Sequence, residues 1–126
     1  MRRRVVVTGV GAITPLGLSA SETWNNALKG KSGVGKITLF ELGECPVHIA
    51  AEVKGYDVTR PLPAPLTPLP GSPALTHAAS TKDARKMGRF IHFALGAGFE
   101  AYSDSGLDSL RSKISPERIG CNIGVG

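Results

Sequence analysis

Two runs of β-branched and aliphatic residues stand near the two ends of the sequence, and each of them runs into glycine. The first run covers Arg4–Val10 and the second covers Arg118–Val125. Neither alternates apolar with polar residues, and this pattern is typical of a strand buried on both faces. Such a strand needs packed layers above and below it. The sequence therefore predicts an α/β protein with a covered, mostly parallel sheet.

A first helix is predicted shortly after the first of these strands. Ser19 and Glu22 have the capping-box spacing, in which each side chain binds the other residue's free backbone amide. Gly30 is placed to stop this helix. Val47–Val53 is predicted as a further short strand. The apolar face of the helix is expected to carry Trp24, Ala27 and Leu28.

A longer helix is predicted to begin at Ser80, with Asp83 as a second capping residue, and to end at Gly106. We interpret its apolar stripe as a packing face. The order of strand, helix, short strands, long helix and strand indicates a layered α/β domain with right-handed crossovers. The residues of the stripe are Met87, Phe90, Ile91, Ala94, Leu95, Gly98, Ala101 and Tyr102.

Between the two helices, Arg60–Pro73 contains six of the nine prolines. Proline fits neither a helix interior nor a central strand, so this segment predicts a loop. We interpret it as an extended surface insertion at about 60–79; the alternative is a ligand for a proline-binding domain.

Composition limits the classes of function. A chain of 126 residues with 41% hydrophobic and 20% charged residues is long enough for one soluble domain or part of one. No apolar run is long enough to span a bilayer, so we expect no membrane partner and a location in the cytoplasm or an organelle matrix. The cysteines and histidines lack metal-ligand spacing, so no metal or disulfide is expected. They are Cys45, Cys121, His48, His77 and His92.

The formal net charge of +5 predicts an acidic partner. Nucleic acid is one such partner, but its binding sites place aromatic or base-reading side chains beside the cations. No such module stands out here. We therefore expect no nucleic acid among the partners.

Gly9 and Gly11 form part of a dinucleotide-binding fingerprint. The third glycine of that fingerprint is replaced by Thr14, and Pro15 delays any helix that would face a phosphate. Glu41 would be the ribose-binding acid, but it lies farther along the chain than the roughly 20 residues expected. A glycine turn after a buried strand is the preferred interpretation, and a nucleotide-binding α/β half remains the alternative.

Four cations recur at helical spacing where the long helix is predicted to begin: Lys82, Arg85, Lys86 and Arg89. The free amides at a helix N-terminus already carry positive partial charge, so cations there are unfavourable by roughly 0.3–1 kcal/mol each. This conflict suggests a docking surface for an acidic or phosphorylated partner. The alternative is an ordinary solvated basic face.

Four blocks of the sequence together resemble one known family. They are RRVVVTGVGAITPLG, ALKGKSGV, RKMGRFIHFALGAGFEAYSDSGL and RIGCNIGVG. In this order they are similar to the N-terminal portion of the β-ketoacyl-[acyl-carrier-protein] synthases, which belong to the thiolase-like condensing enzymes. The resemblance implies that residues 1–126 form an incomplete N-terminal half of a thiolase-like layered domain, with a mostly parallel sheet and covering helices.

The activity that the resemblance implies is acyl transfer. In that family, an acyl group on a cysteine is condensed with malonyl on acyl carrier protein, with decarboxylation, during fatty-acid biosynthesis. The family's nucleophilic cysteine and two histidines belong to later sequence, so we assign no catalytic residue here. The chain alone is expected to be inactive and, lacking sheet neighbours, poorly folded or prone to associate.

The resemblance also implies the partners. Basic residues that open the corresponding helix contact acyl carrier protein, and the matching positions here are Lys82, Arg85 and Lys86. No cofactor is expected, because phosphopantetheine arrives on the carrier protein. The full-length enzyme is expected to be a homodimer.

Overall fold

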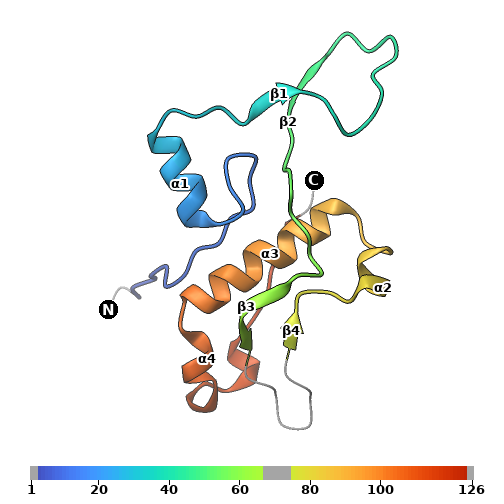
Figure 1. Cartoon of the computed structure of the whole chain (residues 1–126). Coiled ribbons are helices and arrows are strands. Elements are labelled where there is room, and N and C mark those ends of the chain that lie inside the picture. Colours follow the sequence, from blue (N-terminus) through green and yellow to red (C-terminus); the bar gives the residue numbers. More distant parts are fainter. Residues whose placement is uncertain (1–2, 67–74, 125–126) are drawn as a thin grey trace. The chain divides into compact units, whose positions relative to one another are not determined.

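The computed structural model describes residues 3–66 and 75–124 (Figure 1). The chain divides into two compact units. One unit is Ala12–Tyr56, and the other combines Met1–Gly11 with Asp57–Gly126.

In the Ala12–Tyr56 unit, the predicted first helix is confirmed as α1, Ala20–Leu28. The Ser19 hydroxyl accepts a hydrogen bond from the Glu22 amide at 3.1 Å. The Glu22 carboxylate accepts one from the Leu18 amide at 2.8 Å, one residue before the capping-box partner. Gly30 ends the helix in the left-handed region, with φ of +67°.

The same unit contains a two-stranded antiparallel sheet. Strand β1, Val34–Lys36, pairs with β2, Ile49–Ala51, which confirms a strand within the predicted range 47–53. Glu52 follows β2 and binds Thr38, which lies just after β1. Its carboxylate accepts hydrogen bonds from the Thr38 hydroxyl at 2.7 Å and the Thr38 amide at 2.8 Å. These bonds lower the pKa of Glu52.

The second unit begins its regular structure with another antiparallel pair. Strand β3, Pro61–Leu66, pairs with β4, Leu75–His77, and the register shifts between Pro61 and Leu66. The expectation of a loop over Arg60–Pro73 is therefore wrong for Pro61–Leu66, and β4 lies just beyond that segment, within the predicted insertion at about 60–79. Both strands of a two-stranded sheet are edges, so proline is tolerated in them. The middle of the segment, residues 67–74, lies outside the described residues.

The long helix predicted from Ser80 is divided into two. The four-residue α2, Thr81–Ala84, is followed by the 16-residue α3, Arg89–Asp104. Gly88 separates them with extended backbone angles, φ −66° and ψ 154°. Glycine is a poor helix former, so it is a favourable place for this break.

The end of α3 is as predicted. Gly106, with φ of +65°, reverses the chain into α4, Leu107–Leu110. The Tyr102 hydroxyl then donates to the Asp108 carboxylate at 3.1 Å, linking the two helices. Two 3-10 turns follow, at Arg111–Lys113 and Pro116–Arg118.

The strands predicted over Arg4–Val10 and Arg118–Val125 are not formed in the described parts of those segments. Both sheets that the structure describes are antiparallel, so these residues do not contain the expected parallel sheet. The apolar side chains are exposed instead, by 93% at Val5 and 55% at Ile123. An extended segment becomes a strand only when a neighbour takes up its backbone hydrogen bonds, and the described residues supply none.

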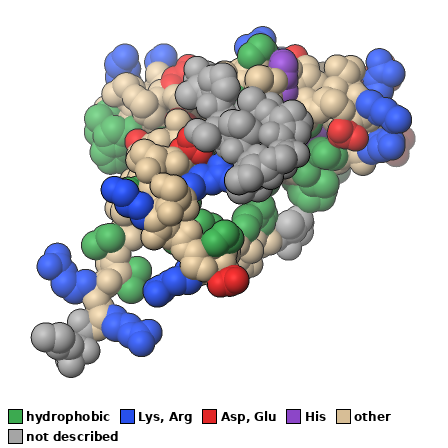
Figure 2. All heavy atoms as spheres, turned by 90° about the horizontal axis from the view of Figure 1, so that it is seen from below, with side chains coloured by type: hydrophobic (Ala, Val, Ile, Leu, Met, Phe, Trp, Pro, Cys, Tyr) green, Lys and Arg blue, Asp and Glu red, His purple; other side chains and the backbone are tan. Residues whose placement is uncertain are grey.

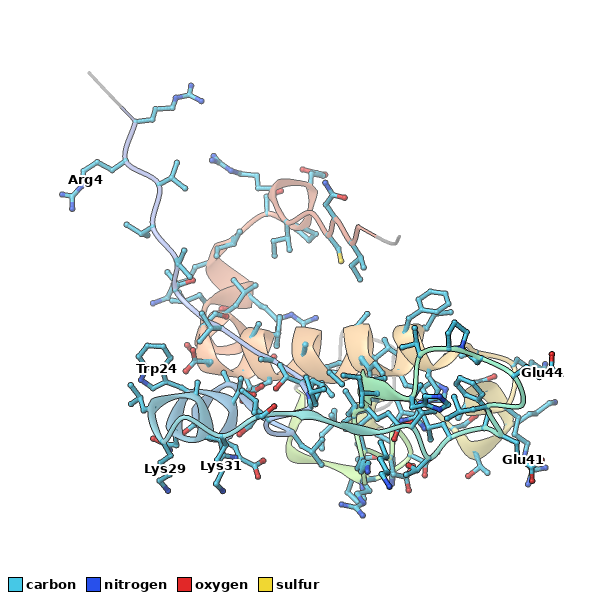
Figure 3. The ribbon with its side chains drawn as sticks, turned by 90° about the horizontal axis from the view of Figure 1, so that it is seen from above. Arg4, Trp24, Lys29, Lys31, Glu41 and Glu44 are labelled. Atoms are coloured by element: carbon cyan, nitrogen blue, oxygen red, sulfur yellow. The ribbon has the colours of Figure 1, made fainter. Side chains whose placement is uncertain are left out.

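The packed core of the described residues is small. Only Val58 and Ala79 are buried hydrophobic residues there. The predicted packing face of α1 is open to solvent, with Trp24 64% and Leu28 67% exposed. Figure 3 shows Trp24 projecting outward from α1.

We expect the isolated 126-residue chain to unfold without a sharp transition. Burial of apolar side chains must offset the conformational entropy lost on folding, and in the described part of the chain only Val58 and Ala79 are buried hydrophobic residues. Thermal melts followed by circular dichroism, with size-exclusion chromatography for association, measure this. A cooperative transition from a monodisperse monomer would contradict the prediction.

Candidate functional site

Three cations lie on and just after α2: Lys82, Arg85 and Lys86. We call them the basic group. Lys82 lies within α2, Arg85 is its C-cap, and Lys86 follows. All three are exposed. Figure 2 shows Lys and Arg side chains gathered at the edge where α2 lies.

The acid nearest in sequence, Asp83, is engaged elsewhere. Its carboxylate accepts a hydrogen bond from the Ser80 hydroxyl at 2.6 Å, and its amide donates to the same hydroxyl oxygen at 3.1 Å. Within the described part of the chain, the ion pairs are Lys54 with Glu52 and Arg111 with Asp108. No ion pair among the described residues involves the basic group, so its three charges are open to an external anion.

The electrostatic reason for singling out these cations is wrong. Because α2 ends at Ala84, Arg85 and Lys86 lie at a helix C-terminus. The unpaired carbonyls there carry negative partial charge, which favours cations. Arg89 alone opens the long helix α3, and its guanidinium lies 5.3 Å from the centre of the Phe93 ring. The four cations do not share one continuous helical face.

A contact that the sequence reading missed connects α2 to α3. The Nε2 atom of His92 lies 3.0 Å from the carbonyl oxygen of Ala84. The sequence predicts one continuous helix that contains both residues. Residues eight apart in a helix are too distant to bond, so only the break at Gly88 makes this contact geometrically accessible.

The other histidines and the cysteines are dispersed. Cys45 and Cys121 are exposed, which corrects the expectation that Cys121 is buried in a strand. His77 Nδ1 lies 2.8 Å from the Thr76 hydroxyl, and the His48 carbonyl accepts the Ile37 amide. Over residues 3–66 and 75–124, no three His, Cys, Asp or Glu side chains are grouped as metal ligands.

Gly9 and Gly11 pack against α3 within their own unit. A Cβ atom on Gly9 would overlap the Ala101 carbonyl oxygen, and one on Gly11 would overlap the Ala97 carbonyl oxygen. Between them, the Val10 amide donates to the Asp104 carboxylate at 2.9 Å. These glycines therefore allow the backbone to approach a helix closely, a task different from cradling a phosphate.

The remaining element of the nucleotide alternative, Glu41, belongs to the Ala12–Tyr56 unit. It is exposed in the loop between β1 and β2, and Figure 3 shows Glu41 and Glu44 pointing outward from that loop. The fingerprint also lacks its helix, because Thr14 and Gly17 pair with each other where the helix would begin. The geometry does not support the nucleotide alternative.

A hollow of about 420 Å³ lies within the Ala12–Tyr56 unit. Its acidic side chains are already engaged, Glu22 by the Leu18 amide and Glu52 by Thr38 and Leu39. Thr14 and Pro15 line it, but none of Gly9, Gly11 and Glu41 and no member of the basic group does. We assign no ligand to it.

No helix in the described part of the chain is long and apolar enough to cross a membrane.

Comparison with known proteins defines the class. The family described as "Beta-ketoacyl synthase, N-terminal domain" matches residues 2–126, so the chain belongs to the β-ketoacyl synthase family. Membership implies a thiolase-like fold and confirms the resemblance inferred from the four sequence blocks.

Similar proteins carry the name 3-oxoacyl-[acyl-carrier-protein] synthase 2. The protein of Coxiella burnetii is 38% identical over 125 residues, which are 99% of this chain and 26% of that protein. That of Staphylococcus aureus strain COL is 36% identical over 124 residues, covering 98% and 25%. That of Synechocystis is 34% identical over 125 residues, covering 99% and 26%. The chain thus spans about a quarter of the length of these relatives.

Substituting Gly11 tests its packing role. In the full-length protein, Gly11→Ala is expected to lower the free energy of unfolding by roughly 1–3 kcal/mol, because the methyl group overlaps the α3 backbone. The matched control is Gly98→Ala within α3, where a Cβ meets no atom within 4 Å. It should be neutral or stabilising by up to about 1 kcal/mol. Denaturant midpoints measure both, and a neutral Gly11→Ala would contradict the packing role.

Proposed function

We propose that the protein to which this chain belongs is a 3-oxoacyl-[acyl-carrier-protein] synthase of fatty-acid biosynthesis. Membership of the family supports this activity, as do the names of its relatives. The reaction is a decarboxylating condensation: malonyl on acyl carrier protein loses carbon dioxide, and the resulting carbanion forms a carbon–carbon bond to an acyl thioester, whose sulfur leaves. We assign the catalytic cysteine and histidines of this reaction to residues outside these 126.

The contribution of this chain is to dock the carrier protein. The single observation that supports it is the basic group, whose three cations are exposed on and just after a short helix. The neighbouring carboxylate, Asp83, accepts a hydrogen bond from the Ser80 hydroxyl and forms no ion pair with these cations among the described residues. An acidic carrier surface would meet these charges at the rim of an interface. Charges in such positions mainly speed association and select the partner.

We further propose that Arg4–Val10 and Arg118–Val125 become strands of a mostly parallel, layered sheet in the full-length protein. The exposure of Val5, Val7 and Ile123 supports this, because large apolar side chains of a folded protein are normally covered. In this proposal residues 1–126 are part of a domain, the segment at about 60–79 is an insertion in it, and the complete protein is a cytoplasmic homodimer.

The insertion lies close to the basic group along the chain. Strand β4 ends at His77, three residues before the Ser80 cap of α2. We infer that the hairpin of β3 and β4 borders the surface on which the carrier protein docks. Its bulk would then restrict the directions from which a carrier protein approaches.

Charge reversal tests the docking assignment. In the full-length enzyme, Arg85→Glu combined with Lys86→Glu is expected to raise KM for malonyl-[acyl-carrier-protein] about tenfold at low salt, equivalent to ~1.4 kcal/mol. The salt dependence of KM should also decrease, since fewer charge pairs remain to be screened.

The matched control is Lys29→Glu, which reverses an exposed cation at the end of α1. It should leave KM unchanged. An unchanged KM for the double variant at low salt would remove the docking assignment. A rise in KM of the same size for Lys29→Glu would mean that the change in net charge alone, and not the position of the charges, raises KM.

A further inference from the structure

The hydrogen bond between His92 and Ala84 has a fixed direction. A carbonyl oxygen can only accept, so the His92 Nε2 atom donates across the 3.0 Å contact. His92 lies in the first turn of α3 and is half-buried. The bond therefore joins the beginning of one helix to the end of the other.

The short helix α2 has little stability of its own. It contains four residues, and an isolated helix needs about 12–15 before it is even marginally stable in water. The last carbonyl groups of a helix also lack partners inside the helix. The Ala84 carbonyl is one of them, and among the described residues it receives, besides the bond from His92, a longer bond of 3.3 Å from the Met87 amide.

Two different contacts hold the two ends of α2. At its start, Ala79 is buried and Ser80 caps the helix. At its end, the Ala84 carbonyl accepts a hydrogen bond from the His92 side chain, which belongs to α3. Gly88, between α2 and α3, is the residue least able to hold the two helices at a fixed angle.

His92 also interacts electrostatically with the carboxylate of Asp57, which Thr59 holds in place. The Thr59 hydroxyl and amide donate to Asp57 at 2.7 Å and 2.9 Å and lower the pKa of that carboxyl, and Arg60 and His92 add smaller effects in the same direction. Val58, beside Asp57 in sequence, is the most buried hydrophobic residue described. His92 thus adds a small favourable charge interaction to Asp57, the residue before Val58.

We propose that His92 is a positioning residue for the basic group, holding the end of α2 so that Arg85 and Lys86 keep one orientation toward the carrier protein. This inference rests on the proposed docking function. Without the bond, the last turn of α2 frays and the two cations must be ordered again each time a partner binds. Ordering long side chains and their backbone reduces affinity.

The experiment compares two substrates in the full-length enzyme. One is malonyl-[acyl-carrier-protein], and the other is malonyl-N-acetylcysteamine, a small thioester without the carrier protein. His92→Phe removes the donor but keeps a ring of similar size. We expect it to raise KM for the carrier-protein substrate about three- to tenfold, the range of one net hydrogen bond, without changing kcat or the kinetics of the small thioester.

His92→Gln is the rescue variant. The glutamine amide nitrogen reaches about as far as the histidine Nε2 and can donate to the same carbonyl, so KM should return toward the wild-type value. His92→Asn, whose amide is one carbon shorter, should behave like His92→Phe. It replaces the phenylalanine variant if that protein does not fold.

Three results would overturn the proposal. His92→Phe and His92→Asn could leave KM for the carrier-protein substrate unchanged, the small thioester could lose as much as the carrier-protein substrate, or His92→Gln could give no rescue. If charge reversal at Arg85 and Lys86 still raises KM in such a case, the docking assignment stands and only the positioning role fails. If charge reversal has no effect, both proposals fail.

Discussion

The close approach of the N-terminal segment to α3 is the constraint on which its unit depends. Gly9 and Gly11 bring their backbone against the carbonyl groups of Ala97 and Ala101, where a methyl group does not fit. The Val10 amide, lying between them, donates to Asp104 and so keeps a protein partner although no strand has formed. An extended segment that pairs with no strand among the described residues is thereby kept in place by a helix, and its outward valines remain exposed.

This arrangement explains which parts of the fold could be predicted from the sequence. Capping boxes and glycine stops act over three or four residues, and the sequence correctly predicts helix starts after Ser19 and Ser80 and stops at Gly30 and Gly106. The helix that starts after Ser80 is, however, the short α2 and not the predicted long helix. Strands depend on partners distant in sequence. Arg4–Val10 and Arg118–Val125 have the composition of buried strands, but composition cannot provide the neighbour that completes their hydrogen bonds.

The candidate site shows the same division. Clustering of the basic group was visible in the sequence, whereas the helix containing it was misjudged, because an apolar stripe continuing past Gly88 concealed the break. One continuous helix would set the charges against its dipole, yet Arg85 and Lys86 lie where the dipole of α2 favours them. Arg85 and Lys86 can therefore be exposed at the end of α2 without destabilising that helix. The sequence gives His92 no metal-ligand spacing and no catalytic position, and its contact with Ala84 exists only because the helix is broken.

A break of this kind has a consequence for recognition. Cations in the first turn of a long helix would be oriented by that helix and would oppose its dipole. In a short helix that ends at Ala84, the dipole conflict disappears, but so does the rigidity that many consecutive backbone bonds provide. Orientation must then come from contacts at the ends of the short helix. The Ser80 cap supplies one end and the His92 imidazole the other. If the basic group docks a carrier protein as proposed, the orientation of its cations would depend on these two hydrogen-bonding side chains and not on the length of a helix.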